Sequence, residues 1–239
     1  MKDDEMPTDL PIAALPELKN FSGSLAQRVY KALLQAILSL SYPPGTVLQK
    51  AVICEQLGVS RHPVSEAITR LAAEGLVDVV PQSATTVSSF SLDEIREAMF
   101  LREALEVAAV RKVAAQHTEE QFTRLSRNVR LQKLLADDDD RDGFYEADEE
   151  FHALIMEFTG YPKLSAVASS VSLQLKRARL LLLPQSGRPA EAAAEHQAIL
   201  DAIQNRDADK AVAQMRLHLG QLISQFEPLE KQRPELFRP

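Results

Sequence analysis

Apolar residues in the first part of the chain recur every three or four positions, which is the spacing of one helix face. Ser24 stands where a helix cap is expected, and Gly58 where a left-handed helix end is expected. Two runs rich in β-branched residues follow, and the short polar turn between them predicts a hairpin. The predicted segments are helices over about 24–40, 50–57 and 60–75 and strands over about 76–80 and 85–90. Three helices followed by a small hairpin is the order of a winged helix-turn-helix.

From Ser91 onward the pattern changes to long amphipathic helices separated by short breaks. The predicted helices cover about 91–116, 119–136, 141–159, 162–183, 189–205 and 207–226. Helices with such short connections pack as a compact antiparallel bundle. The expected fold is therefore mostly α, with a flexible tail over 1–21, a winged helix-turn-helix domain over 22–90, a six-helix bundle over 91–226 and a loose tail over 227–239.

Composition narrows the class of protein that this pattern describes. The chain has 239 residues and is 45% apolar, which excludes general disorder. Its single cysteine, Cys54, excludes a disulfide framework and fits a reducing cytosol, and no apolar run approaches the roughly 20 residues of a membrane span. The net charge of −7 argues weakly against a nucleic-acid binder, and residues 22–90 are about neutral. Only the pattern of the first domain, not its charge, indicates DNA binding.

The third predicted helix has one apolar face and one polar face, as a DNA-recognition helix does. Its polar side carries short hydrogen-bonding groups and few cations, with Arg61 as the strong cation near the helix start. We predict that the residues in contact with DNA are Ser60, Arg61, His62, Ser65, Thr69 and Arg70.

Three of the five histidines fall within the apolar faces of three different bundle helices. Asp148 and His152 stand one helical turn apart and share a face, while His196 and His218 lie on the apolar stripes of two later helices. Burying three imidazoles and an acid is costly unless they satisfy one another or share an ion. The set suits a divalent metal, zinc first, with nickel or manganese as alternatives. The pattern by itself leaves ordinary core histidines as an equal alternative.

Charged residues also interrupt the apolar stripe of the helix over 91–116. Arg102 and Glu106 stand one turn apart there, so they form either a salt bridge or a fork that receives a ligand carboxylate. Arg177 and Arg179 add positive charge to the helix over 162–183, either in solvent or in the same cavity. These four residues are the predicted effector-binding set.

Together these segments resemble the GntR family of bacterial transcription regulators, in its FadR-type branch. The resemblance covers about residues 22–226 and rests on YPPGTVL…EQLGVSRHPVSEAITRLAAEGLVDVVP, FLREALEVAA, DEEFH, EHQAILDAI and MRLH. It implies a DNA-binding homodimer whose helical (FCD) domain binds a small effector, with Arg102 as a pocket arginine. It also implies that Asp148, His152, His196 and His218 hold a divalent metal. Six bundle helices are more similar to the VanR-type subset, which implies a carboxylate effector.

The first domain departs from the family pattern at positions that usually contact DNA. Ala51 and Ser65 stand where arginines are common, and the wing tip is Pro81-Gln82-Ser83-Ala84 rather than a basic turn with glycine. Each arginine–guanine contact contributes about 1–3 kcal/mol of discrimination, so we expect weakened operator binding with a flatter salt dependence.

The sequence thus predicts a cytoplasmic, ligand-responsive transcription regulator that binds double-stranded operator DNA as a homodimer, with no membrane partner and no enzymatic activity. One alternative is a ligand-sensing bundle that has lost operator binding. The other is a zinc-dependent hydrolase in which Glu149, Glu150 or Glu195 acts as general base.

Overall fold

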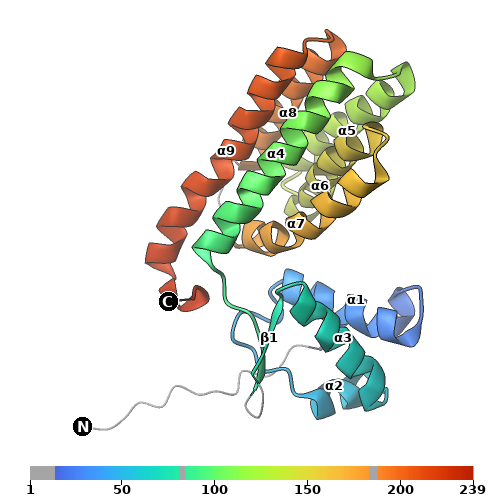
Figure 1. Cartoon of the computed structure of the whole chain (residues 1–239), viewed down its shortest axis with the longest axis vertical. Helices are drawn as coiled ribbons and strands as arrows, with labels where there is room; N and C mark the ends of the chain where they lie inside the picture. The colour runs from blue at the N-terminus through green and yellow to red at the C-terminus, as the bar shows by residue number, and fades with distance from the viewer. Residues whose placement is uncertain (1–13, 81–83, 183–187, 239) are drawn as a thin grey trace. The chain divides into compact units, whose positions relative to one another are not determined.

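The computed structural model of the chain describes residues 14–80, 84–182 and 188–238. The chain divides into two compact units, one formed by residues 1–90 together with 235–239 and the other by residues 91–234. We call the first unit the head and the second the bundle (Figure 1). Among the described residues, no helix is both long enough and apolar enough to cross a membrane.

The head is built on three helices that enclose an apolar core. They are α1 (Leu25–Leu38), α2 (Lys50–Leu57) and α3 (Arg61–Ala73). Ser24 and Gln27 form a reciprocal capping box that starts α1, and Gly58 ends α2 in the left-handed conformation with φ of 63°. α1 packs along α3, and both helices turn their apolar faces fully into the core, where Leu33 and Leu71 are completely buried.

A small antiparallel sheet forms the wing that follows α3. Its strands are β1 (Val77–Val79) and β2 (Thr85–Val87), paired with Asp78 opposite Thr86. The loop before α2 extends this sheet, since Val47 forms a bridge to Thr86. Three helices and a wing confirm the predicted winged helix-turn-helix. Of the predicted wing tip, residues 81–83 lie outside the described part of the chain.

The bundle confirms the mostly helical second domain that the sequence predicts. Its helices are α4 (Leu92–Gln116), α5 (Glu119–Asp137), α6 (Arg141–Phe158), α7 (Pro162–Leu182), α8 (Arg188–Gln204) and α9 (Ala208–Gln232). α4 packs against α9, α7 and α6, while α5 packs against α6 and α8 (Figure 1). Phe151, Ile155, Ile199 and Met215 belong to the shared apolar core that these contacts create.

The chain after residue 226 differs from the predicted loose tail. α9 continues to Gln232 with Pro228 inside it, and a short 3-10 turn, η2, follows at Pro234–Leu236. Phe90 then pairs with this segment, because its N–H donates to the carbonyl of Leu236 at 2.9 Å and its ring lies 5.8 Å from that of Phe237. Burial of these two apolar side chains explains why the C-terminal segment packs on the head.

The predicted N-terminal tail over 1–21 is also partly folded. A 3-10 turn, η1, spans Leu18–Asn20, and the side chains of Leu15 and Leu18 pack against the head core. These apolar contacts order the stretch, although its proline-rich, acidic sequence predicted a flexible tail. Residues 1–13 of the predicted tail lie outside the described residues.

Candidate metal centre and DNA-recognition helix

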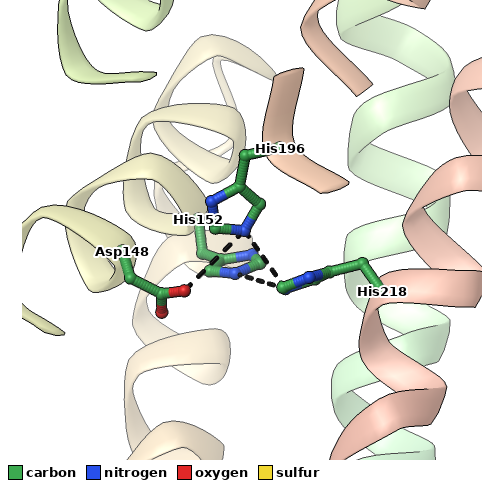
Figure 2. A group of neighbouring side chains, drawn as sticks. All are labelled: Asp148, His152, His196 and His218. Atoms are coloured by element: carbon green, nitrogen blue, oxygen red, sulfur yellow. Dashed lines mark hydrogen bonds and ion pairs between the residues drawn. The ribbon is translucent and has the colours of Figure 1, made fainter. Parts of the chain in front are cut away.

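The four predicted metal ligands meet inside the bundle (Figure 2). α6 supplies Asp148 and His152, α8 supplies His196 and α9 supplies His218. All four side chains are buried, and one ligand atom from each lies within 4.8 Å of the others. Nε2 of His218 lies 3.2 Å from Nε2 of both His152 and His196, and a carboxylate oxygen of Asp148 lies 3.8 Å from Nε2 of His196. The three imidazoles therefore converge through the same ring nitrogen.

The other ring nitrogen of each histidine is held by an oxygen acceptor. Nδ1 of His152 lies 2.5 Å from a carboxylate oxygen of Glu106, and Nδ1 of His218 lies 2.6 Å from one of Glu195. Nδ1 of His196 lies 2.6 Å from the side-chain oxygen of Gln132. Ionised carboxylate and amide oxygens only accept hydrogen bonds, so each Nδ1 carries the proton in the neutral imidazole.

The orientation of the Gln132 amide, which decides the tautomer of His196, follows from its surroundings. Its nitrogen donates to the side-chain oxygen of Asn128 at 2.7 Å and faces the carbonyl of Ala147 at 3.3 Å, which leaves its oxygen toward His196. The hydrogen-bond network thus assigns the protonated nitrogen of this imidazole independently of any ion.

Three unprotonated Nε2 atoms consequently point their lone pairs at one another. Atoms with facing lone pairs at 3.2 Å repel, and a cation between them converts this repulsion into three coordinate bonds. Asp148 adds one negative oxygen to the set. Three imidazole nitrogens and a carboxylate oxygen fit a divalent metal of borderline softness, so these residues meet the chemical requirement for such a group.

Electrostatics keeps Asp148, His196 and His218 in the protonation states that bind a cation. Burial by itself would raise the pKa of the Asp148 carboxyl, but the bound guanidinium of Arg179 holds that pKa well below its usual range. Burial also lowers the pKa of His218 to about 4 and the pKa of His196 well below its usual value. Near neutral pH the acid is therefore ionised and these imidazoles are neutral, as metal coordination requires.

Two cavities adjoin the metal ligands. The first is lined by Asp148 and His218 together with Arg102, Arg179, Arg188 and the apolar residues Phe144, Tyr145, Pro189, Ala192, Leu219 and Leu222. The second is lined by Arg102, Glu106, His152, Lys176, Glu149 and five smaller or apolar residues. Arg102 lines both cavities, so its guanidinium is within reach of either space.

Each of these cavity arginines is paired with a carboxylate. Nε of Arg102 lies 2.5 Å from Glu106, which is the predicted salt bridge. Arg179 binds both Asp148 and Glu149. Burial alone would raise the pKa of Glu106, but Arg102 and then His152 hold that pKa well below its usual range. The positive charge of Arg102 is therefore balanced by the ionised carboxylate of Glu106.

The fourth predicted effector residue, Arg177, lies elsewhere. Its side chain is completely buried, and it is absent from the described linings of both cavities. Arg188 instead occupies a cavity wall, with its guanidinium 2.8 and 2.9 Å from the two oxygens of Glu195. Sequence reasoning missed Arg188 and Gln132. The seven-residue spacing of Arg188 and Glu195, two helical turns, was the available signal.

The acids that a hydrolase would need as general base are held by other groups. Glu149 binds Arg179, and Glu150 accepts a hydrogen bond from the amide of Asn128 at 3.0 Å. Glu195 accepts from Nδ1 of His218 at 2.6 Å. All three acids that the zinc-hydrolase interpretation named as general base are therefore already bonded to other side chains.

The recognition helix α3 presents the polar residues that the sequence selected. Arg61, His62 and Thr69 are exposed and Ser65 is half-buried, while the Thr69 hydroxyl donates to the backbone carbonyl of Ser65 at 2.9 Å. Ala51, at the usual arginine position, is exposed on α2. The predicted DNA contacts of these residues stay a prediction, but all of them except Ser65 have open surface.

The two remaining residues of the predicted DNA-contact set have different surroundings. Ser60 stands at the N-cap position of α3, but its side chain makes no capping hydrogen bond. Arg70 lies over the Tyr30 ring, 3.7 Å from its centroid, and pairs with Glu74 at 3.1 Å. Arg70 therefore also has a structural role within the head.

Family models match both units of the chain. The model described as "Bacterial regulatory proteins, gntR family" matches residues 25–87, and the model described as "FCD domain" matches residues 97–221. The chain is 28% identical to the HTH-type transcriptional repressor RspR of Escherichia coli strain K12 over 88% of this chain and 92% of that protein. It is 33% identical to an HTH-type transcriptional regulator of an unstable DNA locus in Streptomyces ambofaciens over 87% and 88% of the two chains.

Solved structures agree on the fold. Escherichia coli McbR/YncC superposes with a TM-score of 0.71 at 22% identity, over 89% of this chain and 99% of that one. A GntR-type regulator from Rhodococcus sp. RHA1 gives 0.71 at 23% identity, over 85% and 97%. These relatives are regulators of transcription, and no enzymatic family is indicated. The chain is therefore a member of the gntR family of bacterial transcription regulators, with an N-terminal helix-turn-helix head and a C-terminal FCD domain.

Proposed function

We propose that this regulator is a homodimer that holds a divalent metal, zinc first, and changes its affinity for operator DNA when a small organic acid binds in the bundle. The observation that carries the proposal is the convergence of three imidazole Nε2 atoms and the Asp148 carboxylate beside a cavity wall that contains Arg102. Nickel and manganese are the alternative metals for the same ligand set.

The cavity supports an acid as effector because its wall combines cations with apolar surface. Arg102, Arg179 and Arg188 provide planar guanidinium groups that suit a carboxylate. Phe144, Leu219 and the other apolar residues of that cavity wall suit the carbon skeleton of the acid. Since each arginine is already paired, an incoming carboxylate has to compete with a glutamate or aspartate of the protein.

DNA binding would use the winged helix-turn-helix. Two heads of a homodimer would place α3 in successive major grooves of a pseudo-palindromic operator, as helix-turn-helix dimers do. Only an effector with different affinities for the DNA-binding and non-binding states shifts this equilibrium. α4 directly follows the wing in the chain, so we propose it as the element that transmits the change. The regulator would act in the cytoplasm.

A mobility-shift titration on DNA from the protein's own upstream region tests this function. We expect specific, salt-sensitive retardation by metal-loaded dimer and a change in affinity of more than about twofold when a bound organic acid saturates the bundle. Light scattering during size exclusion checks the dimer, and elemental analysis checks the metal. Absence of specific retardation at low salt would instead support a sensing bundle that has lost operator binding.

A further inference from the structure

Two chains of hydrogen bonds with the same chemical order run from the cavity wall to the metal ligands. In one, Arg102 binds Glu106 at 2.5 Å, and Glu106 binds Nδ1 of His152 at 2.5 Å through its other oxygen. In the other, Arg188 binds both oxygens of Glu195, and Glu195 binds Nδ1 of His218 at 2.6 Å. A cavity arginine, a glutamate and a metal-site imidazole are thus connected twice.

The third imidazole shows that a charged partner is not required for the geometry. His196 is held at the same nitrogen by the neutral amide of Gln132, at 2.6 Å. A carboxylate attracts the Nδ1 proton more strongly than an amide does, and it thereby increases electron donation from the opposite nitrogen to a metal. His152 and His218 therefore have a stronger type of outer partner than His196.

A glutamate that also binds an arginine shares its negative charge with the guanidinium. It is then a weaker acceptor for the imidazole than a glutamate without that pairing. The arginine consequently sets how strongly its glutamate supports the histidine, although its guanidinium makes no described bond to that imidazole.

We propose that Glu106 and Glu195 are positioning residues of the metal centre, and that each makes metal affinity depend on the cavity arginine it holds. This inference rests on the proposed function, since it concerns how the proposed metal and acid sites communicate. A carboxylate ligand that binds Arg102 or Arg188 in place of the glutamate leaves that glutamate free to accept more strongly from its histidine. The affinity of the site for the metal then increases. By thermodynamic reciprocity, the metal then tightens the binding of that ligand by the same factor.

Glu195 is the better residue to test because its surroundings tolerate a substitution. Its side chain is 26% exposed and that of Arg188 is 23% exposed, so water can solvate the arginine when the charge is removed. Glu191 provides a matched control, because it also faces Arg188, at 3.7 Å, but is 70% exposed and has no described bond to a metal ligand.

The first experiment measures the Zn²⁺ dissociation constant of full-length protein by competition with a chelator at fixed pH. Glu195→Gln should weaken Zn²⁺ binding roughly 10–100-fold and alter the visible spectrum of bound Co²⁺, whereas Glu191→Gln should leave both essentially unchanged. Far-ultraviolet circular dichroism of the metal-free variants checks their fold. If Glu195→Gln destabilises the fold, the paired variant Arg102→Gln with Glu106→Gln carries the same expectation. An affinity for Zn²⁺ equal to wild type in the folded variant overturns the proposal.

The second experiment asks whether Arg188 affects metal affinity through its bond to Glu195 or only through the long-range field of its charge. Arg188→Gln should tighten Zn²⁺ binding about threefold or more when Glu195 is present, and by clearly less in the Glu195→Gln background. Equal effects in both backgrounds overturn the connection. If wild-type protein binds neither Zn²⁺ nor Co²⁺, the metal part of the proposed function fails as well. Binding by wild type with unchanged binding by Glu195→Gln overturns this inference alone.

Discussion

At the scale of single residues, two arginines that look equivalent in the sequence differ in the groups that their side chains contact. Arg61 and Arg70 stand on the same helix, and both were predicted to meet DNA. Arg70 is bound to Glu74 and lies over a tyrosine ring, whereas Arg61 is exposed at the start of α3. The guanidinium of Arg61 therefore gives up less interaction energy within the head than that of Arg70 when it binds a DNA base or phosphate.

Replacement of Arg61 by alanine should abolish specific operator binding. Loss of one guanidinium contact weakens binding about tenfold or more, and this head lacks the arginines that other family members have at Ala51 and Ser65. Arg96→Ala removes the same charge from an exposed position of the bundle and should leave binding unchanged. Titrations of operator DNA with each variant measure this. Wild-type affinity of Arg61→Ala would show that another face of the head meets the groove.

Replacement of His196 by alanine should remove the metal from the purified protein. The side chain is completely buried, and its Nε2 is one of the three nitrogens that converge. Loss of one of the four proposed ligands, with the side-chain oxygen of Gln132 left without its partner, lowers metal affinity steeply. Elemental analysis after dialysis reports the occupancy, and His117→Ala, a buried histidine outside the ligand set, is the control. Full occupancy in His196→Ala would rule out the proposed ligand set.

At the scale of secondary-structure elements, the C-terminal segment has a role that helix periodicity did not indicate. α9 belongs to the bundle, but the residues after it return to the head and pair with Phe90, the last head residue before α4 begins. The segment is held by backbone hydrogen bonds and a buried ring, so it is part of the fold of the head.

Replacement of Phe237 by alanine should destabilise the head by about 3 kcal/mol, because a nearly buried ring and its contact with Phe90 are lost. Arg238→Ala should cost about 1 kcal/mol or less, since its ion pair with Asp78 is largely exposed. Hydrogen exchange of the α1 and α3 amides, read by mass spectrometry, gives the free energy of opening. Equal exchange in wild type and Phe237→Ala would show that the segment does not support the head.

At the scale of the whole molecule, the chain consists of two units with different sources of stability. The head has an apolar core without a described cluster of candidate metal ligands, whereas the bundle places four candidate metal ligands from three helices in its interior. A metal that binds only the folded bundle stabilises that unit by mass action.

Removal of the metal with a chelator should therefore destabilise the bundle and spare the head. At a free metal concentration of 100 times the dissociation constant, the expected loss is about 2.7 kcal/mol. Segment-resolved hydrogen exchange should show faster exchange in α6, α8 and α9 and unchanged exchange in α1 and α3. Restoration of protection by added Zn²⁺ is the control. Unchanged exchange in α8 and α9 would contradict a metal link between these helices.

The sequence alone determined the features that depend on local periodicity. It placed the helices within a few residues, apart from the end of α9, and ordered the winged domain before the bundle. It also set Asp148 and His152 on one face, because residues one turn apart on a helix must share it. It also selected His196 and His218 through the apolar stripes around them. Periodicity reports which face of an element is buried, but not which residue it meets.

Only the tertiary structure decided the contacts between distant positions. It joined Gln132 to His196 across 64 residues and Glu195 to His218 across 23, and it packed Phe237 against Phe90. The pairings between different helices depend on how whole helices pack, and a spacing along one helix carries no information about them. The four residues of the candidate metal site could therefore be selected one helix at a time, whereas the hydrogen bonds that orient them required the packed bundle.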